Sequence, residues 1–290
     1  MLTGGAATTI MEIIAKLKEN LPRFTKSQRL IAEYLLAHPD RVAFLTASRL
    51  ARELRVSEST VVRFAIALGY DGYADMQKDV QEIIRNRLTT AERMNLSLGN
   101  GNILDKVINN DIQNLKITLE EISREDFEKA VSAIYLARRI YVVGLRSAAA
   151  LAHFFAFYLQ MVLKKPVIRC NPDTIFENLI SIDEQDLVIG ISFHRYTKQT
   201  VEFLKLAKEK GAKTMAITDS LLSPLITHAD AFLLARTDIN SFIDSFVAPL
   251  SIINALIVAI SERQRDETLH TLAELESIWS KVNVYEPPAK

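Results

Sequence analysis

The residues whose types most clearly suggest a function lie between Arg41 and Arg63. This segment contains five arginines and only two glutamates. Ser59 and Arg63 are four residues apart, so on a helix they project from the same face. An arginine can donate two hydrogen bonds to the O6 and N7 atoms of guanine, and serine and threonine can bind base edges or phosphates. We therefore predict a DNA-binding surface with these members: Arg49, Ser57, Glu58, Ser59, Thr60 and Arg63.

Two short helices are needed to position these side chains. Apolar residues recur at helical spacing on both sides of the 55–57 segment: Leu50, Ala51, Leu54, Val61, Phe64 and Leu68. Val56 is placed to fill the corner between the helices, and the Ser57 hydroxyl is placed to cap the second one. This order predicts a helix-turn-helix, although Arg55 stands where the turn frequently contains glycine. The alternative is a pair of amphipathic helices in an ordinary bundle.

Two loops in the second half of the chain form the other candidate site. Each follows an apolar run and precedes a helical pattern, and together they bring glycine, hydroxyls and cations. The candidate ligand-binding residues are Gly144, Arg146, Ser147, Ser192, His194, Arg195 and Thr197. Free backbone N–H groups at helix starts attract phosphate, so the loops predict a site for an anionic small molecule. Ordinary strand-to-helix turns are the alternative.

The elements around these loops indicate an α/β fold. Short apolar runs alternate with helical patterns, at 140–143, 167–169, 187–191, 214–218 and 231–234. This alternation predicts a doubly wound parallel sheet, in which ligands bind beyond the carboxyl ends of the strands. Helices are expected before it at 103–122 and 126–137. A strongly apolar helix is expected after it at 245–260, and its surplus apolar surface is a candidate dimer interface.

A chain of 290 residues is long enough for two domains. Residues 89–102 are polar, include two glycines and lack periodicity, so they are the expected linker. We predict an all-α domain over 1–88 and an α/β domain over 103–290. Within the first domain, further helices are expected at 9–21, from Thr25 or Ser27 to Pro39, and at 74–87.

Composition limits the function classes. The formal net charge is zero, so any nucleic-acid surface must be a local patch. Cys170 is the only cysteine, which excludes an internal disulfide and a Cys-based zinc cluster. We expect no metal and no cofactor. The N-terminus does not resemble a secretory signal and the apolar segment 148–163 is too short to span a bilayer, so we expect a cytoplasmic protein without a membrane partner.

These motifs together resemble the MurR/RpiR family of bacterial transcription regulators. The resemblance lies in the Val56-Ser57 turn, the TVVRF run at 60–64 and the LGYDGY ending at 68–73. The second half resembles the sugar isomerase (SIS) domain, a flavodoxin-like sheet that binds phosphosugars. The resemblance implies a regulator of sugar-phosphate metabolism rather than an enzyme. It would be a homodimer or homotetramer that binds a double-stranded DNA operator and a phosphosugar or related anionic effector.

Both loops depart from the family pattern, which is commonly G-x-G-x-S in the first and S-x-S-G-x-T in the second. Arg146 replaces the second glycine of the first loop, and His194 and Arg195 replace the second serine and the glycine of the other. These added cations either clamp a phosphate, favour a more acidic ligand, or fill the pocket. Two alternatives therefore stay open: a sugar-phosphate isomerase with His194 or Glu177 as base, and an SIS domain used only for oligomerisation.

Overall fold

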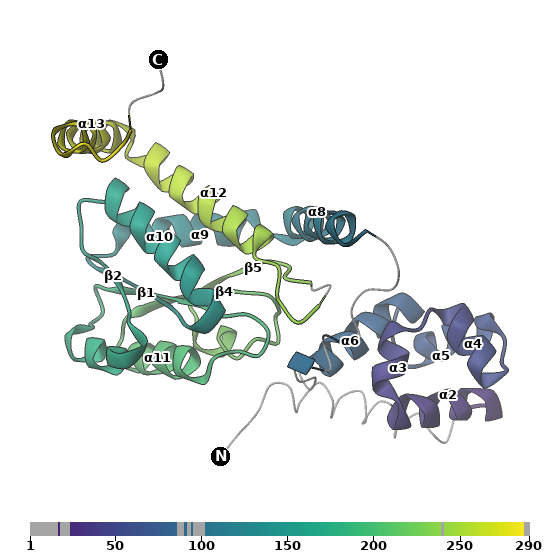
Figure 1. Cartoon of the computed structure of the whole chain (residues 1–290). Coiled ribbons are helices and arrows are strands. Elements are labelled where there is room, and N and C mark those ends of the chain that lie inside the picture. Colours follow the sequence, from purple (N-terminus) through teal and green to yellow (C-terminus); the bar gives the residue numbers. More distant parts are fainter. Residues whose placement is uncertain are drawn as a thin grey trace. The chain divides into compact units, whose positions relative to one another are not determined.

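The structure is a computed structural model that describes residues 17, 24–85, 90–91, 94, 102–238 and 241–286. The chain divides into two compact units, Met1–Ser97 and Leu98–Lys290 (Figure 1). Apart from Leu17, the helix expected at 9–21 lies outside the described residues, as does most of the linker expected at 89–102. The domain boundaries therefore stay a prediction.

The described part of the first unit is all helical, as its sequence predicts. Its elements are α2 (Lys26–Ala37), α3 (Pro39–Phe44), α4 (Ala47–Leu54), α5 (Glu58–Ala67) and α6 (Tyr73–Arg85). The Thr25 hydroxyl accepts from the N–H of Gln28, and the Gln28 side chain accepts in return from the N–H of Thr25. This reciprocal cap fixes the start of α2. Ile31, Phe64 and Met76 are fully buried where α2, α5 and α6 share one core.

Helix α6 closes the end of α3. The Tyr73 hydroxyl donates to the carbonyl oxygen of Leu45 at 2.8 Å, and the amide of Gln77 donates to the same oxygen at 2.8 Å. Terminal carbonyls of a helix have no partner within the helix, so these side chains supply one. Burial raises the pKa of Tyr73 to about 12, which keeps its hydroxyl a donor at neutral pH.

The second unit contains the predicted parallel sheet. Its strands are β1 (Ile140–Gly144), β2 (Val167–Arg169), β3 (Leu187–Ile191), β4 (Lys213–Thr218) and β5 (Ala231–Leu234). They are all parallel and lie in the order β2-β1-β3-β4-β5, which confirms the doubly wound fold. Every residue of β1 and β3 is buried, as expected for a sheet covered on both faces.

Helices cover both faces of this sheet (Figure 1). The helical elements are α8 (Ile103–Glu121), α9 (Arg124–Leu136), α10 (Ala149–Val162), α11 (Lys198–Glu209), α12 (Val247–Arg263) and α13 (Arg265–Val282). Ile140 and Val142 of β1 face the core formed with α9, α10 and α12, whereas Tyr141 and Val143 face α11. This alternation follows from the two-residue period of a strand.

The apolar helix expected at 245–260 is observed as α12, and most of its apolar residues are buried against the sheet core. Helix α13, which follows it, has no counterpart in the sequence prediction. Of its residues only Thr268 is buried. Among the described helices, none combines the length and the apolarity needed to cross a membrane.

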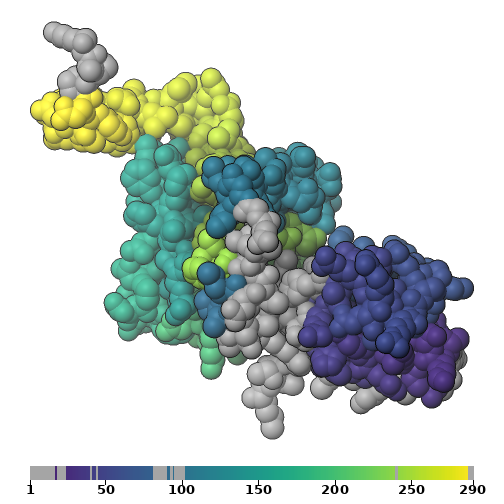
Figure 2. Space-filling model, turned by 45° about the vertical axis from the view of Figure 1, so that its right-hand side comes forward, coloured from purple at the N-terminus to yellow at the C-terminus, as the bar shows by residue number. Residues whose placement is uncertain are grey.

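Helix α8 lies on the surface of the second unit beside α12 (Figure 2), and hydrogen bonds define a polar stripe on its inner side. The side-chain amides of Asn110 and Asn114 both donate to the carbonyl oxygen of Asp238, at 2.8 and 3.2 Å. The Thr118 hydroxyl accepts from the N–H of Arg236 at 2.9 Å. The spacing of four residues places these side chains on one helical face, so α8 is fastened to the backbone that follows β5.

Candidate functional site

The predicted helix-turn-helix is formed by α4 and α5. Helix α4 ends at Arg55, whose backbone is left-handed (φ 53°), and the N–H of Val56 returns to the carbonyl oxygen of Ala51 at 2.9 Å. Val56 is half-buried and packs on the core of the first unit. The turn therefore has the geometry that glycine usually provides, but with an arginine side chain on it.

Helix α5 begins at the Ser57 cap. The Ser57 hydroxyl oxygen accepts from the N–H of Thr60 at 3.2 Å. Val61 and Phe64 are buried, which turns the opposite face of α5 to solvent. On that face Arg63 donates to the carbonyl oxygen and to the hydroxyl of Ser59, both at 3.2 Å.

The predicted DNA-binding residues share this exposed surface to different degrees. The exposed members are Arg49, Ser57, Glu58, Ser59 and Arg63, whereas Thr60 is half-buried. Arg41 pairs with Glu53 at 3.1 Å, so its charge is partly compensated. The local positive excess therefore rests on the remaining arginines, and the contact between Ser59 and Arg63 orients one of them.

The first loop of the second unit starts at Gly144, the last residue of β1. A Cβ atom at this position would lie 2.7 Å from the carbonyl oxygen of Ala148 and 3.0 Å from the Cβ of Ala152. Space therefore requires glycine here. Arg146 follows with a left-handed backbone (φ 57°), and both Arg146 and Ser147 are exposed. We call residues 144–148 the first corner.

The second loop, residues 192–197, is anchored by Ser192, and we call it the second corner. The buried Ser192 hydroxyl oxygen accepts from the N–H of Thr197 at 3.1 Å, and its carbonyl accepts from the Thr218 hydroxyl at 2.8 Å. Thr197 precedes α11, is half-buried and makes no capping hydrogen bond with its side chain. Arg195 is exposed and left-handed (φ 63°).

Asp219 holds this corner, and the sequence analysis did not single it out. Its carboxylate accepts from the N–H of His194 and from the hydroxyl of Tyr196, both at 3.0 Å. These two residues flank Arg195. Thr237, which follows β5, also donates to Asp219 at 3.4 Å. Desolvation outweighs these hydrogen bonds and raises the pKa of Asp219 to about 6.

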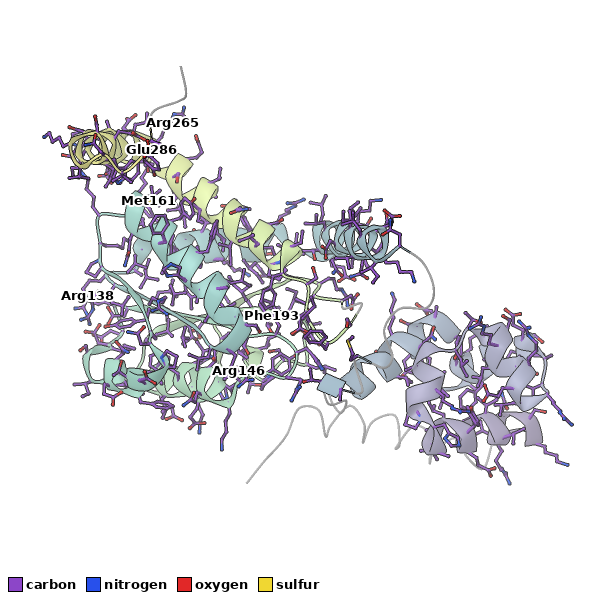
Figure 3. All side chains as sticks on the ribbon, viewed as in Figure 1. Arg138, Arg146, Met161, Phe193, Arg265 and Glu286 are labelled. Atoms are coloured by element: carbon purple, nitrogen blue, oxygen red, sulfur yellow. The ribbon has the colours of Figure 1, made fainter. Side chains whose placement is uncertain are left out.

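The two corners lie side by side, because Gly144 at the end of β1 pairs in register with Ile191 at the end of β3. Figure 3 shows Arg146 and Phe193 at this same edge of the sheet. The chain leaves β1 and β3 toward opposite sides of the sheet, which is where doubly wound folds bind ligands. Hydroxyls, guanidinium groups and the starts of two helices suit an anion.

Within the described residues, no three His, Cys, Asp or Glu side chains gather in a way that could hold a metal ion. Glu177, one of the two bases considered for an isomerase, is exposed in the 3₁₀ turn Phe176–Ser181 that follows β2. His194 is half-buried in the second corner, where its backbone N–H is committed to Asp219.

Two family models match the chain. The model of the helix-turn-helix domain of the rpiR family matches residues 11–87, and that of the SIS domain matches residues 133–259. An HTH-type transcriptional regulator of Caldanaerobacter subterraneus is 24% identical over 288 residues, which are 94% of this chain and 99% of that protein. The HTH-type transcriptional regulator HexR of Escherichia coli is 27% identical over 266 residues, 88% and 89% of the two chains.

Solved structures show the same fold. The sugar isomerase domain of an RpiR transcription factor from Sphaerobacter thermophilus is 35% identical with a TM-score of 0.58, over 60% of this chain and 98% of that one. Vibrio vulnificus NanR, solved in complex with ManNAc-6P, is 22% identical with a TM-score of 0.59, over 93% of this chain and 98% of that one.

Proposed function

Because the chain belongs to the RpiR family of transcriptional regulators, which combine a helix-turn-helix with an SIS domain, we propose that it controls genes of sugar-phosphate metabolism in response to a phosphorylated sugar. In this proposal α5 binds double-stranded DNA, and the first and second corners bind the effector. The observation that carries the effector half is the pairing of Gly144 with Ile191, which puts both corners at one edge of the sheet.

The DNA half rests on the exposed face of α5. Arg63 is held by Ser59 at two atoms, so its guanidinium is oriented before DNA arrives. A recognition helix contacts base edges with residues near its N-terminus, and arginines around it bind phosphates. Ser59 and Arg63 are the base-reading candidates in this arrangement, and Arg49 is a phosphate-binding candidate.

Selection from a random DNA library, followed by fluorescence anisotropy at fixed salt, tests this half. We expect wild-type protein to select a defined operator and Arg63→Ala to bind it about 10- to 100-fold more weakly, with relaxed preference at one guanine. Arg265→Ala is the matched control, because Arg265 is exposed in the second unit and pairs with Glu262 at 2.7 Å. Unchanged affinity and sequence preference in Arg63→Ala would contradict the assignment of α5.

The effector half rests on hydroxyls that face the shared edge. Ser147 is exposed beside the start of α10, and Thr197 stands at the start of α11. Vibrio vulnificus NanR, which has the same fold, was solved with ManNAc-6P. A phosphate between Ser147 and Thr197 would accept from both hydroxyls and from backbone N–H groups at the starts of both helices.

Calorimetric titration with a panel of phosphosugars that includes ManNAc-6P tests this half. For a compound that binds, we expect Ser147→Ala and Thr197→Ala each to lower the affinity about tenfold, the effect of losing one hydrogen bond to a charged group. Thr271→Ala is the control, since the Thr271 hydroxyl is exposed on α13 and donates within its own helix. If neither variant changed the affinity, the effector would bind elsewhere.

Effector and operator must influence one another by the same factor. A ligand changes DNA affinity only through unequal binding to two arrangements of the protein, and this coupling is reciprocal. We therefore expect saturating operator DNA to change the affinity for the effector by the same ratio that the effector changes operator affinity. A ratio of one in both titrations would contradict control of operator binding by the effector.

Helix α8 supplies the surface that we assign to self-association into a homodimer or homotetramer. Its exposed large apolar residues are Ile103, Leu104, Val107, Ile108, Ile112 and Leu119. Beside it a largely apolar groove of about 530 Å³ lies between α8, α9 and α12. We expect Leu119→Glu to shift the sedimenting species toward monomer, whereas Leu269→Glu on α13, also exposed, leaves it unchanged. An oligomer that is indifferent to both changes would place the interface elsewhere.

The named relatives are transcriptional regulators, and we propose no isomerase activity for this chain. An aldose–ketose exchange needs a base beside the C1–C2 bond of the substrate. We expect purified protein to leave phosphosugars that it binds unconverted, as followed by NMR over hours. Turnover that His194→Ala abolishes would instead favour an enzyme.

A further inference from the structure

We propose that the effector carries a second acidic group beside its phosphate, and that Arg146 and Arg195 bind this group. The ligand class would then be the phosphorylated sugar acids rather than neutral phosphosugars. This inference rests on the proposed effector site, and it narrows the chemistry of what binds there. The hydroxyls and helix starts of the two corners already suit one phosphate, so two added cations at the same edge call for additional negative charge.

Both arginines occupy backbone positions that favour glycine. Among the described residues, the non-glycine residues with positive φ are Arg55, Arg146, Arg195 and Asn283. A side chain in the left-handed region costs free energy that glycine avoids. Both corners nevertheless carry arginine at this position. Its guanidinium group is permanently charged, and its planar arrangement of N–H donors matches the two oxygens of a carboxylate. We read this as a requirement for the guanidinium groups at this edge.

The backbone conformation at Arg195 is held by hydrogen bonds to a residue outside the second corner. His194 and Tyr196, the residues before and after Arg195, both donate to Asp219 at 3.0 Å, and Asp219 directly follows β4. Ser192 binds the N–H of Thr197 across the same loop. The backbone that carries Arg195 is therefore preorganised. This reduces the conformational entropy that is lost when the arginine side chain binds an anion.

The backbone conformation at Arg146 is also held by a hydrogen bond. Arg146 is the first residue of the short 3₁₀ turn Arg146–Ala148, and its carbonyl oxygen accepts from the N–H of Ala149. The close approach of Ala148 to Gly144 leaves this turn no room to collapse onto β1. The two arginines thus extend from neighbouring strand ends of one rigid sheet.

Filling of the pocket by the arginines would require protein carboxylates to neutralise them. Arg146 is exposed and forms no ion pair within the described part of the chain. In the second corner, the Asp219 carboxylate accepts from His194 and Tyr196. The arrangement of Arg146 favours binding of an external acid over filling of the pocket.

The test compares ligands that differ only in the second acid. In 6-phosphogluconate a carboxylate stands where glucitol 6-phosphate has a hydroxymethyl group. The pair 5-phosphoribonate and ribitol 5-phosphate repeats the comparison with a shorter chain. In calorimetric titrations of the full-length protein, we expect the acid to bind at least about tenfold tighter than its alditol in one of the two series, as a charge-assisted bidentate contact would give.

Glycine variants connect this ratio to the two arginines. Arg146→Gly and Arg195→Gly remove the charge and place a residue that suits positive φ, so they preserve the backbone. We expect each to bring the acid-to-alditol ratio at least threefold closer to one. Arg55→Gly makes the same change at the left-handed arginine of the first unit, and we expect it to leave the ratio unchanged.

The outcomes separate this inference from the function on which it rests. Equal affinities within both pairs, or a ratio that neither glycine variant changes, would overturn the inference while a bound alditol phosphate would still support a phosphosugar regulator. Gluconate binding as tightly as 6-phosphogluconate would show that the phosphate is not recognised and would overturn the proposed effector site. Binding of none of these four phosphorylated compounds, and of no phosphosugar in the panel that tests the effector half, would overturn both.

Discussion

The turn of the helix-turn-helix and the second corner both place an arginine in a left-handed conformation, but they fix it differently. Arg55 is fixed locally, because its N–H binds carbonyls of Ala51 and Arg52 at the end of its own helix. Arg195 is fixed by Asp219, which directly follows a different strand, β4, and accepts hydrogen bonds from both neighbours of Arg195. The turn is thus determined by a few consecutive residues, whereas the second corner depends on the assembled sheet.

A second contrast lies between these arginines and the glycine of the first corner. Gly144 does not have a positive φ, and what requires glycine there is the 2.7 Å approach of the Ala148 carbonyl. Arg55, Arg146 and Arg195 have positive φ. A dihedral angle that favours glycine can be tolerated by another residue at a modest cost, but an occupied volume cannot.

Among the variants that test this contrast, Gly144→Ala is expected to change the free energy of unfolding the most. The added methyl group meets a backbone carbonyl, so the free energy of unfolding should fall by about 3 kcal/mol, the upper range for overpacking. Urea denaturation measures it. Gly190→Ala in β3 is the control, because the nearest atoms there are ends of leucine side chains at 3.3 to 3.5 Å, which can move. Equal losses in both variants would show that steric space is not what selects Gly144.

Asp219→Asn tests whether the second corner depends on the assembled sheet. The pKa of Asp219 is raised from 3.8 to about 6, so the protonated carboxyl favours the folded state. This stability is fully present below about pH 4 and is lost as the pH rises through 6. The difference in unfolding free energy, wild type minus variant, should therefore fall by about 2 kcal/mol between pH 4.5 and 7.

Urea denaturation of both proteins across this pH range measures that difference, since other titrating groups are common to both and cancel. Asp230→Asn is the control: its carboxylate accepts from Thr214 at 2.9 Å and its pKa is lowered from 3.8, so its stabilisation is lost only as the pH falls below about 4 and its difference should stay flat over this pH range. A flat difference for Asp219→Asn would mean that its carboxyl is not held in a desolvated site.

Gly69→Ala measures the cost of a positive φ to the free energy of unfolding, without any steric clash. Gly69 has φ 89° and no atom within 4 Å of an added Cβ, so only the backbone conformation opposes alanine. We expect a loss of about 1 kcal/mol in thermal or chemical denaturation. Gly72→Ala, which also has free space but no positive φ, should change stability by less than about 0.5 kcal/mol.

Arg55→Gly is expected to have the smallest effect, with the opposite sign. Relief of the left-handed conformation stabilises the turn by about 1 kcal/mol, and the greater freedom of glycine in the unfolded chain offsets roughly half of that. Chemical denaturation should show a gain below about 1 kcal/mol. A clear loss of stability would reveal that the Arg55 side chain itself supports the turn.

The sheet could be predicted from the sequence because each strand is a short apolar run. The observed strands match the predicted ones within one residue at each end, since strands buried on both faces need no polar alternation. Helix α13 was not predicted, although apolar residues recur there at helical spacing: Leu272, Leu275, Trp279 and Val282. The pattern was available, but these side chains are at most half-buried in the structure, so the helix adds little to the core.

Only part of the candidate effector site could be predicted from the sequence. The hydroxyls and cations of both corners stand out because they directly follow apolar runs. Asp219 also directly follows an apolar run, and its place at a strand end was the available signal. Its partners His194 and Tyr196 lie in the loop after β3, about 25 residues earlier, and no local spacing encodes that contact. The DNA-binding and effector-binding assignments stay predictions.

The polar stripe of α8 has a consequence for how the chain matures during synthesis. Asn114 is almost completely buried, and its amide donates to Asp238, 124 residues further along the chain. The ribosome therefore releases α8 long before its hydrogen-bonding partner exists, and contacts of such sequence separation form slowly. The first helix of the unit is fastened only when the segment after β5 has emerged, so a nascent chain that stops short of Asp238 leaves this helix without its anchor.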